Sequence, residues 1–211
     1  MSDADDRKTV YVVDDDEAVR IALNRSLGMR GYNVVLCESA EDFLDRFTEI
    51  VPSCLLLDVR MPGIGGLELQ ESLNKAGIKV PVIFVTGHGD IPMSVRAIKQ
   101  GAVDFLEKPY LVDTLQERIE IALALSLEWA SESESQAQIQ DRFESLTARE
   151  RDVLRLLVAG AADASNKSIA RELEISHRTV DDHRARIMAK MSARSLPELV
   201  DMAKICGIHR L

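Results

Sequence analysis

Residues 54–63 of this 211-residue chain have the sequence CLLLDVRMPG, an apolar run that ends at Asp58 and leads into a turn. Comparable strand-like runs precede polar residues elsewhere: Thr9–Val13 before Asp14 and Asp15, Val82–Val85 before Thr86, and Asp104–Glu107 before Lys108 and Pro109. Runs of about four to eight apolar residues are typical of strands buried on both faces, as in a parallel sheet covered by helices. The segment before Asp58 therefore predicts a buried strand.

The segments between these runs have the apolar spacing of helices. After the first run, four apolar residues recur at helical intervals: Val19, Ala22, Leu23 and Leu27. Gly31 is placed to end that helix in the left-handed conformation. The remaining predicted elements are a strand at Val34–Cys37 and helices at Gly66–Leu73 and Met93–Gln100. This alternation over about the first 125 residues predicts a parallel α/β sheet.

The polar residues that follow the strands are expected to meet in one crevice. In open parallel sheets, ligands bind beyond the carboxyl ends of the strands, where the strand order reverses. The residues at these ends are Asp14, Asp15, Asp58, Thr86 and Lys108. Clustered carboxylates repel each other unless a cation is present, and donors that are all oxygen favour Mg²⁺. We expect Asp58 to accept a phosphoryl group covalently, with the Lys108 ammonium and the Thr86 hydroxyl paired with its oxygens.

Each of these residues on its own also suits an ordinary turn. An acidic run such as residues 14–16 often caps a helix or lies in solvent, and a lone Thr86 or Lys108 carries little information. Their joint order favours the phosphoryl site, because each follows a strand-like run and helix-length segments separate them. The Lys108–Pro109 peptide bond is open to either the cis or the trans form.

Four motifs, in this order, resemble the receiver domain of two-component response regulators. They are VVDDDE at 12–17, DVRMPGIGG at 58–66, TGHGD at 86–90 and DFLEKP at 104–109, and the resemblance covers residues 8 to about 125. It implies a doubly wound, five-stranded parallel sheet of the flavodoxin-like kind, and phosphorylation of Asp58 by a sensor histidine kinase. It further implies Mg²⁺ held by Asp15, Asp58 and the Arg60 carbonyl, with Asp14 assisting through water.

The same resemblance implies a conformational switch. Thr86 is expected to move toward the phosphate while Phe105 turns inward, which changes the surface around the fourth helix and the fifth strand. This agrees with the expected effect of a new, doubly charged acceptor on its nearest donors. Arg60 and His88 lie two residues beyond site residues and are candidates for tuning water access.

Beyond the receiver, the sequence predicts a helical linker and then a small all-α domain. We assign residues 1–125 to the receiver, 126–145 to the linker and 146–211 to the second domain. In the linker, residues 131–140 consist of Ser, Glu, Gln, Ala and Ile, which suits an exposed helix or a loosely ordered segment. Thr147 and Glu150 form a capping box before the stripe of Val153, Leu156 and Leu157, and further helices are expected near 166–173, after Ser176 and near 196–205.

The second domain has the pattern of a helix-turn-helix. LTARERDVLRLLVAG at 146–160 and NKSIARELEISHRTVDDHRARIMAKM at 166–191 resemble the LuxR/NarL-type effector domain, in its FixJ-like branch. The resemblance implies that the helix after Ser176 enters the major groove. It also implies that the fourth helix of this second domain, near 196–205, mediates dimerisation. The candidate DNA-binding residues are Lys167, Arg178, Thr179, Asp182, His183, Arg186 and Lys190.

Two features depart from that family's pattern. The loop between Gly160 and Asn166 carries three extra residues within Ala161–Ser165, which an exposed loop tolerates. Asp181 and Asp182 stand where at most one acid is usual. Two carboxylates facing the groove would repel phosphates, or one of them would accept a hydrogen bond from cytosine.

Charge and composition indicate different partners for the two halves. The net charge is −9, with 13 Lys and Arg against 24 Asp and Glu in residues 1–140, and 13 against 11 in residues 141–211.

The start, Met1–Lys8, does not resemble a signal peptide, and no run reaches the roughly 18 apolar residues of a membrane helix. The three cysteines form no CxxC pair. We therefore expect a cytoplasmic protein with reduced thiols and no membrane partner.

Two hypotheses follow. The first is a phosphorylation-activated transcription regulator, not an enzyme, that dimerises when phosphorylated and binds promoter DNA, with RNA polymerase as a further partner. The alternative is a phosphotransfer or protein-interaction module whose helical domain contacts protein. The weak positive charge of residues 141–211 and the acids at 181 and 182 motivate the second hypothesis.

Overall fold

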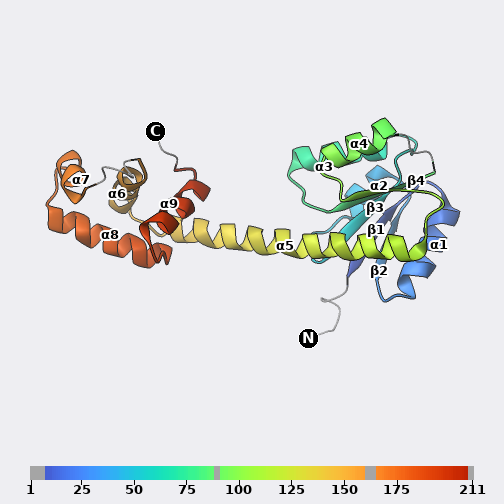
Figure 1. Ribbon diagram of the computed structural model, residues 1–211, viewed down its shortest axis with the longest axis horizontal. Coiled ribbons are helices and arrows are strands. Elements are labelled where there is room, and N and C mark those ends of the chain that lie inside the picture. The colour runs from blue at the N-terminus through green and yellow to red at the C-terminus, as the bar shows by residue number, and fades with distance from the viewer. Residues whose placement is uncertain (1–7, 88–90, 160–164, 209–211) are drawn as a thin grey trace. The chain divides into compact units, whose positions relative to one another are not determined.

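The structure is a computed structural model that describes residues 8–87, 91–159 and 165–208. Five parallel strands form one sheet in the order β2-β1-β3-β4-β5 (Figure 1). They are β1 (Thr9–Val13), β2 (Asn33–Cys37), β3 (Ser53–Leu57), β4 (Val82–Thr86) and β5 (Asp104–Glu107). The reversal of strand order between β1 and β3 creates the crevice that this topology offers to ligands. The predicted doubly wound α/β fold is confirmed.

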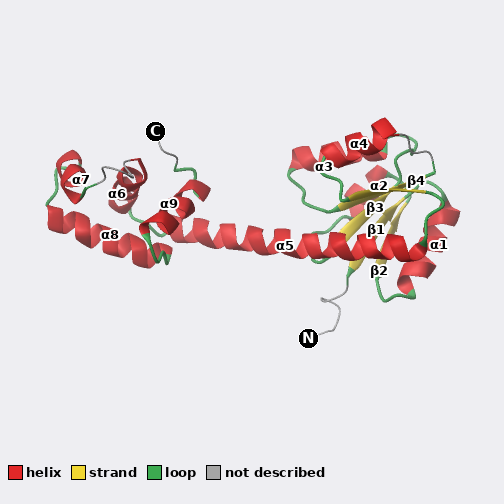
Figure 2. Ribbon diagram, viewed as in Figure 1, coloured by secondary structure: helices red, strands yellow, loops and turns green. Residues whose placement is uncertain are grey.

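Alternate residues of each central strand enter two separate cores. On one face, Tyr11, Leu55 and Phe84 pack with α2 (Ala40–Arg46), α3 (Gly66–Ala76) and α4 (Ile91–Lys99). On the other face, Val12, Leu56 and Ile83 pack with α1 (Glu17–Gly28) and the first half of α5 (Val112–Glu144). Figure 2 shows helices covering both faces of the yellow strands. Burial of both faces explains why these strands are continuous apolar runs.

The chain divides into two compact units, Met1–Ser131 and Glu132–Leu211. Residues 126–145, expected as the linker, are helical and belong to the long helix α5 apart from the last residue, Ser145. No helix in the described ranges is both long enough and apolar enough to span a bilayer.

The second unit is built on helices α6 (Ala148–Ala159), α7 (Asn166–Glu172), α8 (His177–Met191) and α9 (Leu196–Ile205). Their core includes Val153 and Leu157 of α6, Ile169 of α7, and Val180 and Ile187 of α8. Ser176 caps α8 by accepting a hydrogen bond from the Thr179 backbone N–H. The predicted helix-turn-helix is thus present, with α7 as the supporting helix and α8 as the second.

Some element boundaries differ from the sequence prediction. Helix α1 ends at Gly28, three residues before Gly31, although Gly31 does adopt the left-handed conformation with φ of 87°. Thr86 is the last residue of β4 instead of the first residue after it. The Lys108–Pro109 peptide bond, left open by the sequence, is cis. His88, the candidate for tuning water access, lies outside the described residues, as do Gly160 and most of the extra loop that follows it.

Candidate functional sites

Asp58 lies directly after β3, at the carboxyl edge of the sheet. Its backbone N–H donates to the Val13 carbonyl at 2.8 Å, which fixes it beside the end of β1. One carboxylate oxygen, Oδ2, accepts a hydrogen bond from the Arg60 backbone N–H at 2.7 Å. The residue is 8% exposed. Asp58 is therefore held in place by backbone contacts while part of its carboxylate stays accessible.

Gly66, the first residue of α3, packs directly against the backbone of Asp58. Its own N–H donates to the Val59 carbonyl at 3.0 Å. A Cβ at this position would overlap the Asp58 carbonyl oxygen and press on the Leu57 side chain. Only glycine lets the start of α3 approach this closely, so the third and last glycine of the DVRMPGIGG motif helps to position Asp58.

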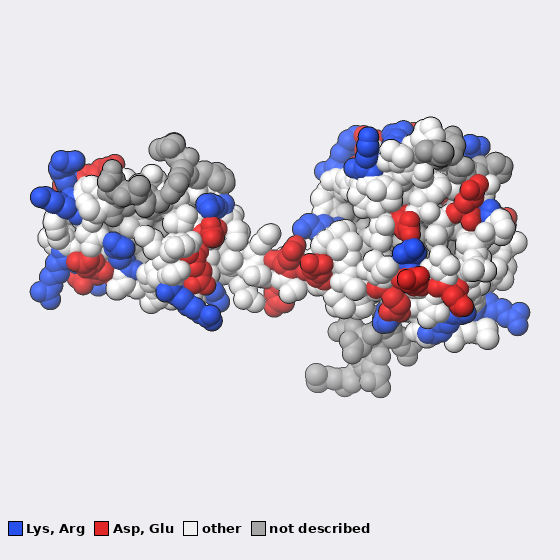
Figure 3. All heavy atoms as spheres, in the orientation of Figure 1, with Lys and Arg blue, Asp and Glu red and all other residues white. Residues whose placement is uncertain are grey.

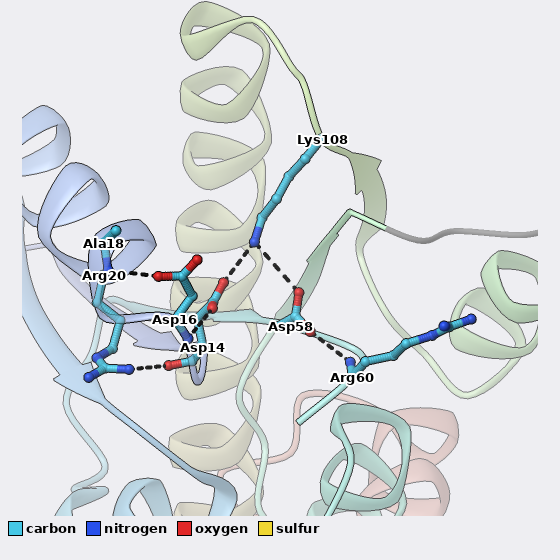
Figure 4. Close-up of polar contacts among 7 residues, drawn as sticks. All are labelled: Asp14, Asp16, Ala18, Arg20, Asp58, Arg60 and Lys108. Carbon is cyan, nitrogen blue, oxygen red and sulfur yellow. Dashed lines mark hydrogen bonds and ion pairs between the residues drawn. The ribbon is translucent and has the colours of Figure 1, made fainter. Parts of the chain in front are cut away.

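Lys108 links two carboxylates across the crevice. Its Nζ lies 2.8 Å from Oδ2 of Asp14 and 3.6 Å from Oδ1 of Asp58 (Figure 4). The Lys108 backbone N–H donates to the Thr86 carbonyl at 2.8 Å, so its position depends on the end of β4. Strands β1, β3 and β4 thus each help to place one charged group, as the order of the motifs predicted.

Two further residues, Arg20 and Asp16, hold Asp14, and neither was predicted as a site residue. Arg20 of α1 donates from Nη1 to the Asp14 carbonyl at 2.7 Å, and the Asp16 backbone N–H donates to Asp14 Oδ1 at 2.9 Å. Asp16 also caps α1 by accepting from the Ala18 N–H at 2.8 Å. Arg20 lies six residues after Asp14, and only the turn between β1 and α1 brings them together. The DDD run therefore combines a helix cap with a site residue.

The electrostatics of the crevice favour a further cation. Burial raises the pKa of the Asp58 carboxyl, and the neighbouring Asp14 and Asp15 raise it further, against the lowering effects of the Arg60 N–H and Lys108. Burial alone would lower the pKa of Lys108, but its contacts with Asp14 and Asp58 raise it above the ordinary value. Three carboxylates and one ammonium leave a net charge of −2 when all are ionised.

The donor set of this crevice suits Mg²⁺ in its chemistry. Asp14, Asp58, the exposed Asp15 and the Arg60 carbonyl offer only oxygen atoms, and the unbalanced negative charge is what a hard divalent ion would neutralise. Within the described ranges, however, no three His, Cys, Asp or Glu side chains are arranged as a metal site. The Lys108 ammonium occupies the space between the two buried carboxylates, and Asp15 lies in solvent.

The two predicted switch residues lie on neighbouring strands. Thr86 is buried at the end of β4, with 1% exposure. Phe105 of β5 is partly buried, and its ring centroid lies 6.2 Å from that of Phe84. Phe105 thus packs at the border of the core formed with α2, α3 and α4.

In the second unit, most of the predicted DNA-binding residues are exposed. Figure 3 shows Lys and Arg side chains along α7 and α8, with acidic side chains between them. The exposed candidates are Lys167, Arg178, Asp182 and Arg186. Thr179 is partly buried, and its hydroxyl lies 2.8 Å from that of Ser176. His183 is also partly buried, and its Nδ1 has no hydrogen-bond partner among the described residues.

Lys190 has a partner within the protein. Its Nζ lies 2.8 Å from Oε2 of Glu150 and donates to the Ser145 carbonyl at 3.0 Å. A DNA phosphate at the flank would therefore have to compete with this pair, because the Lys190 ammonium already binds the start of α6. The proposed DNA contacts do not include it.

The two neighbouring acids of α8 differ in their contacts. Asp181 accepts a hydrogen bond from the side-chain amide of Asn166, the first residue of α7, and Arg184 donates to the Asn166 amide oxygen. Asp182 is exposed and has neither a hydrogen bond nor an ion pair among the described residues. Asp181 and Asp182 therefore do not act as a pair.

Comparisons with known proteins agree with this architecture. Residues 10–120 match the response regulator receiver domain, and residues 144–203 match the bacterial regulatory proteins of the luxR family. The chain is 46% identical over 199 residues to the transcriptional regulatory protein FixJ of Bradyrhizobium diazoefficiens, covering 94% of this chain and 96% of FixJ.

Solved structures give the same result. The structure of the response regulator StyR has a TM-score of 0.76 and 44% identity, covering 94% of this chain and 98% of StyR. Full-length FixJ from B. japonicum has a TM-score of 0.55 and 44% identity, covering 94% of this chain and 97% of FixJ.

Proposed function

Because this chain belongs to the FixJ-like response regulators of two-component systems, we propose that Asp58 is its phosphoryl acceptor and that phosphorylation controls DNA binding by α8. Family membership makes the protein a DNA-binding transcription regulator. The alternative of a helical domain that contacts only protein receives no support from the comparisons. The observation that carries the assignment of Asp58 is the Lys108 ammonium shared between Asp14 and Asp58.

This geometry suits covalent transfer of a phosphoryl group to Asp58. Its Oδ2 accepts the Arg60 N–H, which leaves Oδ1 facing Lys108 as the attacking oxygen. The Lys108 ammonium would then pair with the phosphoryl oxygens, and the Thr86 hydroxyl would donate to one of them. The phosphoryl group would come from a sensor histidine kinase.

Mg²⁺ would be held by Asp15, Asp58 and the Arg60 carbonyl, with Asp14 assisting through water. When bound, it would supply the positive charge that the crevice lacks, so that an anionic phosphoryl group can approach three carboxylates. Lys108 would provide further positive charge, since its ammonium already contacts Asp14 and Asp58.

In the second unit, we propose that α8 lies in the major groove of promoter DNA. The contacts assigned to it are Arg178, Thr179, Asp182, His183 and Arg186, with Lys167 at the start of α7 for a flanking phosphate. Two phosphorylated chains would bind two half-sites as a homodimer, which raises affinity by bringing two weak binders together. RNA polymerase is the expected further partner at the promoter.

The direct test compares phosphorylated and unphosphorylated protein on DNA. Duplexes are selected from a random library with the full chain, acetyl phosphate and Mg²⁺, and binding is then measured by anisotropy. The phosphodonor is expected to increase binding for the wild type and for Asp45→Asn, an exposed acid outside the crevice. It should have no effect on Asp58→Asn. An equal increase with Asp58→Asn would refute the proposed switch.

Salt dependence tests whether the contact is with DNA phosphates. Binding should weaken steeply between about 50 and 200 mM salt, since each neutralised phosphate releases counterions. A chain that binds no duplex under any of these conditions would restore the protein-interaction alternative.

A further inference from the structure

Helix α8 presents one outward stripe of charged residues. Arg178, Asp182 and Arg186 follow each other at intervals of four, so they lie on the same side of the helix, and all three are exposed. Val180 and Ile187 point into the core on the other side. A carboxylate therefore lies in the middle of the surface that is proposed to face DNA.

The acid next to it, Asp181, has a clear structural role. It binds the Asn166 side chain, which also accepts a hydrogen bond from Arg184, and this network joins the start of α7 to α8. Such a contact fixes the angle between the two helices of the helix-turn-helix. Asp181 therefore does not need a DNA contact to explain its presence.

Asp182 has no comparable structural contact with any residue that the structure describes. Arg178 and Arg186 are each four residues away, where acid–base pairs often stabilise a helix, yet no ion pair joins either to Asp182 in the described part of the chain. The helix dipole favours an acid only in the first turn of a helix. Asp182 is the sixth residue of α8 and lies beyond that turn. Its carboxylate is thus free to meet a ligand.

The chemistry of the major groove limits what this carboxylate can bind. A carboxylate only accepts hydrogen bonds, so phosphates and the acceptor edges of guanine and thymine repel it. Cytosine presents its N4 amino group as a donor, whereas adenine presents its N6 donor beside the N7 acceptor. A cytosine amino group is therefore the partner that costs least to place opposite Asp182.

We propose that Asp182 is a specificity-determining residue that selects cytosine at one position of each half-site by accepting a hydrogen bond from N4. This inference rests on the proposed DNA-binding function and adds a base preference to it. Arg178 and Arg186, on either side along the stripe, would offset the repulsion between Asp182 and the phosphates of the backbone.

The test is a selection of bound sequences, because a preference for one base at one position reports more than affinity. The full-length wild type, Asp182→Ala, Asp182→Asn and Glu172→Ala are each treated with acetyl phosphate and Mg²⁺ and allowed to select from a random duplex library. Glu172 is an exposed acid of α7 with no hydrogen bond or ion pair in the described ranges, so its variant controls for the loss of one negative charge.

The wild type and Glu172→Ala are expected to enrich cytosine at the same position. Asp182→Ala should lose that preference by at least about fivefold while the other positions of the site keep theirs. Asp182→Asn should shift the preference at that position toward adenine, since a side-chain amide can pair with N6 and N7.

Two results would overturn the inference, and they are distinguishable. If Asp182→Ala binds all sequences more tightly but selects the same site as the wild type, Asp182 only repels phosphates and selects no base. If the wild type itself enriches no sequence, the proposed DNA-binding function fails together with the inference. Retained helix content by circular dichroism in both Asp182 variants excludes misfolding as the cause of a changed preference.

Discussion

Two lysine–carboxylate pairs have the same nitrogen–oxygen distance of 2.8 Å, but the charge balance around them differs. In the first unit, Lys108 contacts Asp14 and also faces Asp58, so one ammonium serves more than one carboxylate. In the second unit, Lys190 contacts a single carboxylate among the residues that the structure describes, that of Glu150. The first cluster has unbalanced negative charge, and the second is balanced.

The pKa directions reflect this difference. Burial and neighbouring acids raise the pKa of Asp58. Burial alone would also raise the pKa of Glu150, but hydrogen bonds from Lys190 and from Thr147 lower it to about 2. A cluster whose negative charge is only partly compensated is suited to bind a cation or accept a charged group, whereas a balanced cluster stabilises a fold. The same contact distance can thus mark either a reactive site or a structural one.

Replacing Lys108 should give the largest effect. In Lys108→Met, phosphorylation of Asp58 by acetyl phosphate should slow by about 100-fold, because a preorganised positive charge facing the phosphoryl group is lost. The rate of adduct formation, followed by intact-protein mass spectrometry, checks this. Lys79→Met is the matched control, since Lys79 is exposed and follows α3 at the opposite end of β4. An unchanged rate in Lys108→Met would remove Lys108 from the mechanism.

Gly66→Ala should disturb the reactive cluster without changing any charge. The new Cβ would overlap the Asp58 carbonyl, so the first unit should lose about 1–3 kcal/mol of unfolding free energy, and phosphorylation should slow. Gly28→Ala is the control, because its Cβ would meet no atom within 4 Å. Denaturant unfolding of both variants measures the difference, and equal stabilities would show that α3 can shift away from Asp58 at little cost.

Glu150→Gln should affect only the balanced cluster. Loss of the charge-assisted hydrogen bond from Lys190 is expected to lower the unfolding free energy of the second unit by about 2 kcal/mol. The rate of Asp58 phosphorylation should stay at the wild-type value. Hydrogen exchange resolves the two units: faster exchange confined to α6 and α8 agrees with the comparison, while faster exchange in β3 would contradict it.

The pH dependence of the second unit should give the smallest effect. The pKa of Glu150 is about 2 in the folded chain and 4.5 ordinarily, so the unfolded state takes up the proton first. The stabilisation by Glu150 is therefore complete above pH 4.5 and is lost as the pH falls toward 2. Between about pH 6 and pH 3, the wild type should lose more stability than Glu150→Gln in denaturant titrations. Parallel losses would show that other groups dominate.

The sequence predicted the sheet and the reactive crevice because both depend on local patterns. Each buried strand is a continuous apolar run, and each run ends at the residue that enters the site, as Asp58 shows after β3. The order of the motifs then placed Asp14, Asp58 and Lys108 together. The capping box of Thr147 and Glu150 was also visible, since its members lie three residues apart.

Contacts between residues far apart in the sequence could not be predicted in this way. Lys190 was taken for a DNA contact because its partner, Glu150, lies 40 residues earlier. Asp181 was grouped with Asp182 because the contact with Asn166 depends on how α7 packs against α8. The close approach of Gly66 to Asp58 likewise depends on packing. Periodicity shows which face of a helix is buried, but not which side chain it meets.

The most direct test of the central claim is to locate the phosphoryl group itself. The full chain is treated with acetyl phosphate and Mg²⁺, digested, and analysed by peptide mass spectrometry. We predict one modified residue, Asp58, with no adduct in the Asp58→Asn variant. An adduct on Asp14, Asp15 or any other residue, or no adduct at all, would contradict the assignment of the Lys108 crevice as the phosphoryl site.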